Sequence, residues 1–324
     1  MKPLVSIVIP AYNAEKYIEK TLESVFNQIF TDYEIIVVDD GSTDNTPNIL
    51  TKYGDKITYI RQRNSGGPSS PRNRGIEIAK AEYIALFDSD DLMFEDKLRR
   101  QVNILDKNPE VSLVFSDFVI LNEDGQQNKS MFEKGPVKEI INSIPQKKIG
   151  CNVYRFEEPI YDEILQNNFI GTSTVVFRKK DILEIGIFNE SLIGIEDRDM
   201  WLRFSKAGKI FAYTTDVLSY YRYMDNSLSR QTKNLVSQID FYQRLLQNDL
   251  NSKNYIIVKN RIGELCLSYG YILRNNRMFL PAIFQNVKSF FYLNINFKYK
   301  ALVAIIKVII ITFVPRLSSS LSRK

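Results

Sequence analysis

Two acidic segments in the first hundred residues carry the side-chain types that bind divalent metal ions. Residues 37–44 read Val-Val-Asp-Asp-Gly-Ser-Thr-Asp, and residues 83–91 read Tyr-Ile-Ala-Leu-Phe-Asp-Ser-Asp-Asp. Repulsion among Asp88, Asp90 and Asp91 would raise the pKa values of their carboxyl groups unless a cation lies among them. Carboxylate oxygens without histidine or cysteine favour Mg²⁺ or Mn²⁺, which usually keep positions open for phosphate oxygens. The segments therefore predict a metal or nucleotide site. The alternative is that these residues only cap helices.

Several other classes of site are excluded by composition. The 324-residue chain has no histidine and only two cysteines, Cys151 and Cys266. Zinc sites, Ser-His-Asp triads and Cys-His dyads each need an imidazole or a cysteine cluster. The first apolar run is not followed by Gly-x-Gly-x-x-Gly, and the sequence has no Walker loop. Because these phosphate cradles are missing, we expect a metal ion to hold the phosphates of any bound nucleotide.

The elements that must position the acids can be predicted for the first 120 residues. Continuous apolar, β-branched runs are typical of strands covered on both faces, and they occur at residues 4–9, 33–38, 57–60, 83–87 and 111–118. Helices are predicted at residues 14–26, with Asn13 as the N-cap, and at 71–80 and 95–108. This alternation predicts an α/β fold with a doubly wound, mostly parallel sheet. Both acidic segments follow strands, so they should lie at the carboxyl edge, where such sheets bind ligands.

The second part of the chain has a different pattern. Residues 122–168 are polar with scattered prolines, and we interpret them as an irregular binding loop. Strands are predicted at 172–177, 210–213 and 217–222, and a helix at 197–207. From Gln231 onward the pattern is helical to the end of the chain.

Four segments, taken in order and spacing, resemble the inverting family-2 glycosyltransferases of GT-A fold. They are residues 10–13 (Pro-Ala-Tyr-Asn), 38–44 (Val-Asp-Asp-Gly-Ser-Thr-Asp), 64–75, which contain Asn-Ser-Gly-Gly and Pro-Arg-Asn-Arg-Gly, and 87–91 (Phe-Asp-Ser-Asp-Asp). The resemblance covers roughly residues 4–230. It implies a glycosyltransferase domain at 1–230, with a nucleotide-binding half at 1–120 and an acceptor-binding half at 121–230. A helical, basic, membrane-proximal region at 231–324 would follow.

The resemblance also implies roles for individual residues. Pro10, Ala11 and Tyr12 would line the base and ribose pocket, Asp40 would accept a hydrogen bond from the base, and Arg72 would help to hold the nucleotide. Asp88, Ser89 and Asp90 would form the DxD motif, with Asp90 as a ligand of Mn²⁺ or Mg²⁺ and Asp88 near the ribose or the metal. The alternative for Arg72 is an ordinary surface charge on a helix.

A second acidic pair, Glu196 and Asp197, is similar to the Glu-Asp segment of the same family at a helix start, whose Asp is the general base. Direct displacement at an anomeric carbon needs such a group, because the acceptor hydroxyl must lose its proton as it attacks. We assign this role to Asp197, with Glu196 as its supporting partner; helix capping is the alternative for both. Trp201 is the only tryptophan, and it is either a platform for the acceptor sugar or a core residue.

Two departures from the family qualify this interpretation. Many relatives carry a histidine after the strand that ends here at Arg222, whereas this sequence has Met224 there, a poor ligand for Mg²⁺ or Mn²⁺. The Gln-x-x-Arg-Trp signature of processive synthases is absent, which favours a single transfer over polymerisation.

The resemblance implies a metal-dependent inverting enzyme that moves one sugar, most simply from a UDP-sugar, to a glycan or lipid-linked acceptor in bacterial surface polysaccharide synthesis. Two alternatives are a catalytically silent sugar-nucleotide-binding protein and a nucleotidyltransferase.

Charge is distributed unevenly along the chain. The last acidic residue is Glu264, and the sixty residues after it contain nine Lys or Arg, whereas the first 264 residues have 34 basic and 38 acidic residues. The basic tail predicts an anionic membrane surface as its partner, and we expect no nucleic acid partner. Residues 301–314 are too short a helix to span a bilayer, and residues 4–9 are too short for a signal peptide. The alternative for residues 301–314 is a buried core helix that packs on the catalytic domain. We therefore expect a cytoplasmic protein attached peripherally to the inner face of the cell membrane.

Overall fold

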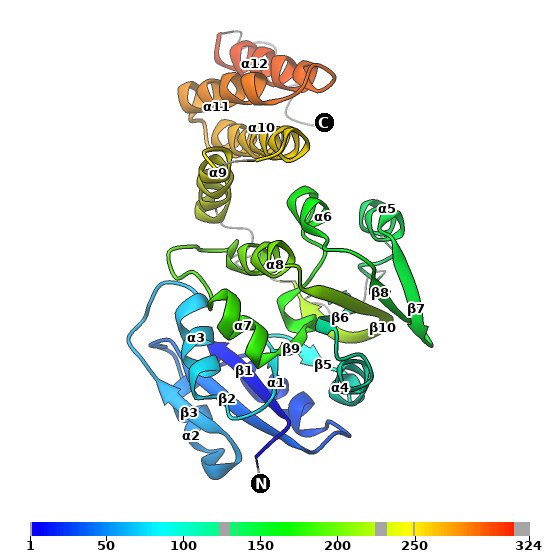
Figure 1. Cartoon of the computed structure of the whole chain (residues 1–324). Helices are drawn as coiled ribbons and strands as arrows, with labels where there is room; N and C mark the ends of the chain where they lie inside the picture. Colours follow the sequence, from blue (N-terminus) through cyan, green and yellow to red (C-terminus); the bar gives the residue numbers. More distant parts are fainter. Residues whose placement is uncertain (1, 123–129, 134, 224–231, 249, 314–324) are drawn as a thin grey trace. The chain divides into compact units, whose positions relative to one another are not determined.

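The computed structural model describes residues 2–122, 130–133, 135–223, 232–248 and 250–313. Its internal contacts divide the chain into two compact units, Met1–Asp225 and Asn226–Lys324. The first unit contains the sheet and the second is helical (Figure 1).

One sheet organises the first unit. In the described part of the chain its strands are β1 (Val5–Ala11), β2 (Tyr33–Asp39), β3 (Thr58–Arg61), β4 (Tyr83–Leu86), β5 (Leu92–Met93), β6 (Val111–Leu121), β7 (Gln146–Gly150), β8 (Val153–Phe156), β9 (Val176–Arg178) and β10 (Ile210–Arg222). They are ordered β3-β2-β1-β4-β9-β6-β10-β8-β7, and β5 pairs with β10. Among these described strands, the pairings make β5, β8 and β9 run opposite to the other seven. The predicted α/β fold with a mostly parallel sheet is confirmed.

Helices cover both faces of this sheet. They are α1 (Ile18–Phe26), α2 (Thr46–Thr51), α3 (Ser69–Ile78), α4 (Lys97–Lys107), α5 (Gly135–Ser143), α6 (Tyr161–Gln166), α7 (Lys179–Ile185) and α8 (Glu196–Lys206), with 3₁₀ turns at Gly54–Lys56 and Thr172–Thr174. Ile7 and Ile9 of β1 join a buried core with residues of α1, α2 and α4. Val8 points to the other face, where it contacts Gly75 of α3 so closely that a Cβ at position 75 would collide with it. Alternate residues of one strand thus serve two helical layers.

The acidic segments meet at one edge of the sheet, as predicted. β1 lies between β2 and β4, and Ala11 pairs with Asp39 at the carboxyl ends of β1 and β2. The backbone N–H of Phe87, just beyond β4, donates to the carbonyl oxygen of Val8 at 3.0 Å. The next loop, which carries Asp88 and Asp90, therefore leaves the sheet beside the Asp39 loop.

The predicted helix start at Asn13 is wrong. The helix α1 begins at Ile18, and Asn13 has a φ of 49°, in the left-handed region that asparagine tolerates. The Asn13 Oδ1 atom accepts a hydrogen bond from the Thr43 N–H at 2.8 Å, and the Asn13 N–H donates to the Ser42 hydroxyl at 2.9 Å. Asn13 therefore joins two loops of the sheet edge instead of capping a helix.

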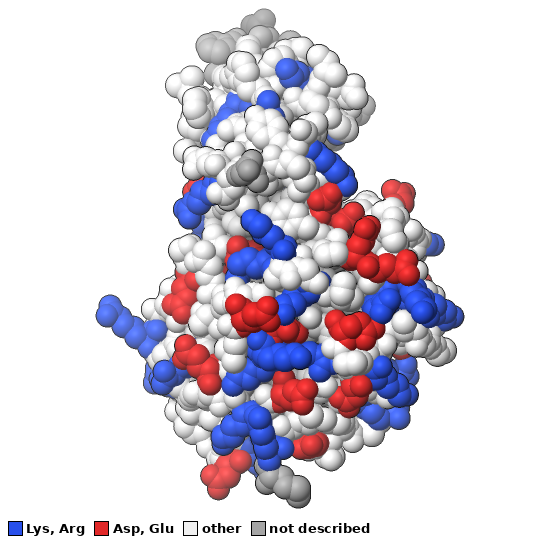
Figure 2. All heavy atoms as spheres, viewed as in Figure 1, with Lys and Arg blue, Asp and Glu red and all other residues white. Residues whose placement is uncertain are grey.

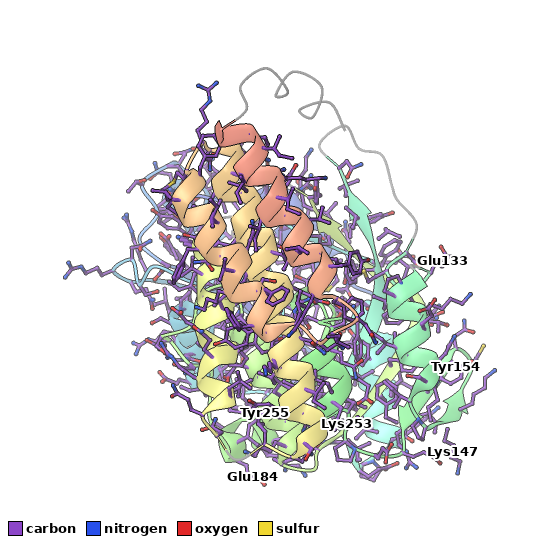
Figure 3. The ribbon with its side chains drawn as sticks, turned by 90° about the horizontal axis from the view of Figure 1, so that it is seen from above. Glu133, Lys147, Tyr154, Glu184, Lys253 and Tyr255 are labelled. Atoms are coloured by element: carbon purple, nitrogen blue, oxygen red, sulfur yellow. The ribbon has the colours of Figure 1, made fainter. Side chains whose placement is uncertain are left out.

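The irregular loop predicted at residues 122–168 is also wrong for its described part, which contains α5, β7, β8 and α6. The strands β7 and β8 form an antiparallel hairpin at the end of the sheet, where Figure 3 labels Lys147 and Tyr154. Three of the five residues of β7 are exposed, so the edge strand lacks the apolar alternation that would have revealed it. The helices α5 and α6 have nine and six residues, too few turns for a clear helical period.

Two smaller differences concern strands. Residues 210–222 form one strand, β10, and not two, because the register shifts between Thr214 and Val217 interrupt the pattern without ending the strand. The predicted strand at 172–177 is a 3₁₀ turn followed by the three-residue strand β9.

The second unit consists of helices, as the pattern after Gln231 predicts. They are α9 (Thr232–Leu246), α10 (Ser252–Asn275), α11 (Phe279–Tyr292) and α12 (Lys298–Phe313). The helices α10 and α11 approach closely at Gly270, where a Cβ would collide with the side chain of Asn286 on α11, and at Gly263, where a Cβ would lie 2.7 Å from the side chain of Leu293, the residue after α11. Within the described ranges, no helix combines the length and the apolarity needed to cross a membrane.

Candidate active site

The loop after β1 brings an aromatic side chain to the ligand edge of the sheet. Tyr12 is 52% exposed, whereas Pro10 and Ala11 are buried in the strand. The N–H of Asp40 donates to the carbonyl oxygen of Ala11 at 2.8 Å, so Tyr12 and Asp40 leave neighbouring strands at the same level. Of the three residues predicted to line the base pocket, only Tyr12 offers a side chain to solvent.

Asp39 holds the loop after β2 together from inside. Its carboxylate is fully buried and accepts hydrogen bonds from the Ser42 N–H at 2.9 Å and the Tyr59 hydroxyl at 3.1 Å. The Arg61 Nε atom lies 3.4 Å away. Burial and the Asp39 carboxylate raise the pKa of Tyr59 to about 12. Asp39 is thus a structural acid whose charge the protein itself satisfies.

Asp40 is buried and joins the same loop to residues 62–65. Both of its oxygens accept from the N–H and the hydroxyl of Ser65, at 2.9–3.1 Å, and Gln62 Nε2 donates to Oδ1 at 2.7 Å. Gly41, with a φ of 75°, makes this approach possible, because a Cβ there would lie 2.7 Å from the Asn64 nitrogen. Five hydrogen bonds from Ser65 and Gln62 thus end on a carboxylate that is buried.

The loop after β4 carries carboxylates that the protein does not fully satisfy. Burial and then the neighbouring Asp88 carboxylate raise the pKa of Asp90 to about 6. Asp91 is buried, and burial followed by repulsion from Asp90 and Asp88 raises the pKa of its carboxyl group well above the ordinary value. Its Oδ1 accepts from the Arg222 N–H at 2.9 Å, and Ser173 and the Arg222 N–H oppose the rise in its pKa, but among the described residues its Oδ2 has no hydrogen-bond partner within bonding geometry.

Neighbouring elements fix the backbone of this loop. The Thr21 hydroxyl on α1 donates to the carbonyl oxygens of Ser89 and Asp91, and Arg222 Nε donates to that of Asp90 at 2.8 Å. The Asp88 N–H donates to the Ser173 hydroxyl at 3.0 Å. The predicted DxD segment is therefore held rigidly.

The residues at this loop fit a divalent metal ion that completes its coordination with ligand atoms. Among the described residues, no group of three acidic, histidine or cysteine side chains could hold a metal ion by itself. Mg²⁺ and Mn²⁺ in phosphate sites are commonly held by only one or two carboxylates, and substrate phosphates supply further ligands. Burial raises the pKa of Asp90 first and the Asp88 carboxylate raises it further, and a cation between the two acids would oppose both effects.

Arg72 connects this loop to the other acidic pair. It is buried on α3, and its Nη2 lies 2.7 Å from Asp88 Oδ1 while its Nη1 lies 2.9 Å from Glu196 Oε1. Burial alone would lower the pKa of Arg72, but Asp88 and Glu196 outweigh it and raise that pKa. The surface-charge alternative for Arg72 is wrong. With only 4% of its side chain exposed, Arg72 is placed to connect two acids rather than to reach a nucleotide directly.

Glu196 and Asp197 begin the helix α8 but have different surroundings. Glu196 is 5% exposed, and burial raises the pKa of its carboxyl group although Arg72 opposes the shift. Asp197 is partly exposed, and its Oδ2 accepts from Asn168 Nδ2 at 3.1 Å and from the Thr172 hydroxyl at 3.4 Å. Asp197 is therefore the member of the pair that solvent can reach.

Trp201 is not a platform for a sugar. Its side chain is fully buried on α8 and packs against Phe177 and Phe204, with ring centroids 6.5 Å and 6.3 Å away. The acceptor hypothesis for Trp201 is wrong and the core alternative is correct, because the helix turns this position towards the sheet.

Other parts of the site had no clear signal in the sequence. Arg222, Ser173 and Asn168 contact the two acidic segments from separate elements. Lys97 is fully buried, donates to Gln101 and to the carbonyl oxygen of Thr174, and has a pKa that burial lowers to about 7. Met224, at the position for which the resemblance predicted a histidine, lies outside the described residues.

Comparison with solved structures confirms the fold. The chain is similar to TarS 1–349 of S. aureus, solved in complex with UDP-GlcNAc, with a TM-score of 0.61 and 20% identity over 94% of this chain and 89% of that one. It is also similar to the mannosyltransferase PcManGT of Pyrobaculum calidifontis, solved with GDP-Man and Mn²⁺, with a TM-score of 0.55 and 16% identity over 99% and 84% of the two chains. At such identities these likenesses establish the architecture alone.

Sequence relatives identify the family. The chain is 31% identical to the putative teichuronic acid biosynthesis glycosyltransferase TuaG of Bacillus subtilis, over 70% of this chain and 82% of that protein. It is 29% identical to the Escherichia coli UDP-Glc:alpha-D-GlcNAc-diphosphoundecaprenol beta-1,3-glucosyltransferase WfgD, over 83% and 96% of the two proteins. The family model described as glycosyl transferase family 2 matches residues 6–183, more than half of the chain. The predicted family is confirmed: this protein is a glycosyltransferase that belongs to glycosyl transferase family 2.

Proposed function

We propose that this glycosyltransferase is a metal-dependent, inverting enzyme that transfers one sugar from a nucleotide-diphospho-sugar, in the first place a UDP-sugar, to an acceptor hydroxyl. The observation that carries the proposal is the position of Arg72, which links Asp88 of the DxD segment to Glu196 beside Asp197. A site for a phosphorylated donor and a candidate base thus share one buried network. Residues 1–120 would bind the nucleotide, and residues 121–230 the acceptor.

The donor would bind along the carboxyl edge of the sheet. Tyr12 is exposed there and would stack on the base, while Asp40, whose carboxylate is shared between Ser65 and Gln62, would accept from a base N–H. Support for uridine comes from TarS, which was solved with UDP-GlcNAc, and from WfgD, which is named as an enzyme that uses UDP-Glc. Asp90, with Asp88 and Ser89 beside it, would hold Mn²⁺ or Mg²⁺, which supplies positive charge for the donor diphosphate and the departing nucleotide.

Asp197 would act as the general base. Its carboxylate takes the proton of the acceptor hydroxyl while the hydroxyl oxygen bonds to the anomeric carbon and the bond from that carbon to the diphosphate oxygen breaks. Attack opposite the leaving group inverts the configuration. Asn168 and Thr172 orient one oxygen of Asp197. Glu196 is buried against Arg72, so we assign it a positioning role.

The acceptor would be a lipid-linked glycan of a bacterial surface polysaccharide, met at the inner face of the cell membrane. This part of the proposal is supported by two relatives, since TuaG is named for teichuronic acid biosynthesis and WfgD for a diphosphoundecaprenol-linked acceptor. Residues 231–324 would then be the membrane-proximal part of the chain.

A donor panel tests the proposal. The protein is incubated with UDP-, GDP- and dTDP-sugars and a GlcNAc-diphosphoprenol acceptor, and nucleotide release and product anomer are measured with and without EDTA. We expect UDP release from a UDP-sugar, loss of turnover in excess EDTA and an inverted anomeric centre in the product. Undiminished turnover in EDTA would contradict the metal dependence. Donor binding without any release would indicate a silent binding protein, and release of sugar 1-phosphate in place of UDP would indicate transfer of the nucleotidyl group, as by a nucleotidyltransferase.

A further inference from the structure

The helices α11 and α12 expose apolar side chains along stripes that the helical unit does not cover. On α11 the exposed positions Leu280, Phe284, Val287 and Phe291 are spaced by four, three and four residues, which places them on one helix face. On α12 the corresponding stripe runs from Leu302 through Ile306 to Ile309. We define the apolar face as Leu280, Phe284, Phe291, Ile295, Leu302 and Ile306.

The apolar face is not the side on which these helices pack within their unit. Ala282 of α11 and Val308 of α12 are buried and form a core with Leu273 of α10. The buried Ser289 hydroxyl of α11 also donates to the Gly263 carbonyl oxygen of α10 at 2.7 Å. The helices lie side by side in both Figure 1 and Figure 3. In contrast to Ala282 and Val308, Phe284 and Phe291 are 67% and 69% exposed, and Leu280 and Ile295 are each 80% exposed.

Cationic side chains accompany the apolar face, and acids do not. Lys288 lies on α11, Lys298, Lys300 and Lys307 lie on α12, and the sequence contains no Asp or Glu after Glu264. Two of these lysines lie over aromatic rings, Lys298 over Phe290 at 4.9 Å and Lys300 over Phe297 at 4.8 Å. Figure 2 shows this end of the chain as mostly uncharged surface with scattered basic side chains.

From these observations we infer that the apolar face and its lysines are a monotopic docking surface for anionic lipid. Helices of this type lie in the plane of the membrane, with apolar side chains at the acyl boundary and Lys and Arg at the headgroups. A second copy of this chain fits the same surface poorly, because a symmetric contact would bring lysines together without acids to pair them. The contact with lipid is inferred from the helices alone. That this contact brings the enzyme to a lipid-linked acceptor rests on the proposed function.

The test is co-sedimentation of the full-length protein with phosphatidylglycerol-containing and pure phosphatidylcholine vesicles. We expect binding to the anionic vesicles at low salt and at least tenfold weaker binding to the neutral ones. The double variant Phe284→Ser/Phe291→Ser should bind anionic vesicles at least about tenfold more weakly, since two large apolar groups no longer enter the interface. Lys300→Gln/Lys307→Gln should weaken binding by about fivefold per charge. Leu183→Ser, which changes an exposed apolar residue of the first unit, should bind as the unaltered protein does.

Donor hydrolysis in solution is measured on every variant. Preserved UDP release with lost vesicle binding separates the docking surface from catalysis, and a failed donor assay with intact vesicle binding overturns only the proposed function. Equal binding to neutral vesicles, or unaltered binding by Phe284→Ser/Phe291→Ser, would overturn the inference. A concentration-dependent dimer in the absence of lipid that the same variant abolishes would also overturn it, because the apolar face would then be an interface between copies.

Discussion

Two acidic loops lie at the same edge of the sheet, yet the protein treats their charges differently. After β2, Asp39 and Asp40 are buried and receive hydrogen bonds from backbone, hydroxyl and amide donors of the protein. After β4, burial and the neighbouring carboxylates raise the pKa values of Asp90 and Asp91, and Asp91 Oδ2 accepts no hydrogen bond from the described residues. The two loops do not differ in their number of acids. They differ in how many hydrogen bonds the protein donates to the carboxylates. We infer that the first loop is built to stay folded and the second to receive a cation.

The largest expected effect comes from Asp90→Asn in the second loop. Loss of this charge should lower sugar transfer by roughly 10²–10³-fold, because the donor diphosphate loses the ion that neutralises it. Initial rates at saturating Mn²⁺ measure the effect. The matched control is Asp55→Asn, at an exposed position away from both loops, and it should keep its full rate. A fully active Asp90→Asn enzyme would remove the distinction between the loops.

The next effect concerns the link between the acidic segments. Arg72→Met leaves Asp88 and the buried Glu196 without their cation, and it should lower the free energy of unfolding by about 3–5 kcal/mol. Arg74→Met is the matched control, since Arg74 is exposed on the same helix. Urea denaturation of both variants gives the comparison. Equal stabilities would show that the buried ion pairs of Arg72 with Asp88 and Glu196 do not stabilise the fold.

The same chemical change in the first loop should destabilise the protein. Asp39→Asn weakens the hydrogen bonds from Ser42 and Tyr59 and places an amide beside Arg61. We expect a loss of about 2 kcal/mol in the free energy of unfolding without ligand, because charge-assisted bonds are among the stronger ones. Denaturation at neutral pH provides the measurement, and a stabilised variant would refute the structural role of Asp39.

In the second loop, the change of Asp90 to Asn should raise the free energy of unfolding, measured without ligand and in EDTA, whereas Asp39→Asn should lower it. The pKa of Asp90 is raised in the folded state to about 6, so this group favours folding below its unfolded pKa of about 4 and loses that contribution as the pH rises through 6. Asp90→Asn should therefore gain roughly 1–2 kcal/mol over the unaltered protein at about pH 8, and this gain should vanish towards pH 4. A gain that does not change between these pH values would contradict the repulsion that we infer.

The sequence predicted the fold well where the strands are covered on both faces. The continuous apolar runs at β1, β2 and β4 predicted buried strands. Because these strands are parallel, both acidic segments were predicted at the same edge of the sheet. The edge hairpin β7–β8 could not be found in this way, because its residues face solvent and lack a period. The left-handed turn at Asn13 depends on hydrogen bonds to Ser42 and Thr43, about thirty residues away, which no local pattern contains.

The sequence predicted the acidic residues of the candidate site, but it did not predict the side chains that form hydrogen bonds or ion pairs with them. Sequence spacing could not show that Arg72 is buried while Arg74 on the same helix is exposed. Nor could it show that Arg222 and Ser173 come from distant elements to hold the second loop. The sequence could not place Trp201, because an aromatic residue near the start of a helix can contact a ligand or pack in the core. The packing of Trp201 against Phe177 and Phe204 shows that it belongs to the core.

The most direct test of the account compares two neighbouring acids of α8. Asp197→Asn keeps the size of the side chain but cannot accept a proton at neutral pH, whereas Asp199→Asn only removes an ion pair with Arg203 on the same turn. We expect kcat to fall by roughly 10²-fold or more in Asp197→Asn with an almost unchanged KM for the donor, and to change less than about twofold in Asp199→Asn. Normal transfer by Asp197→Asn, especially with loss of transfer in Glu196→Gln, would contradict the assignment of Asp197 as the base.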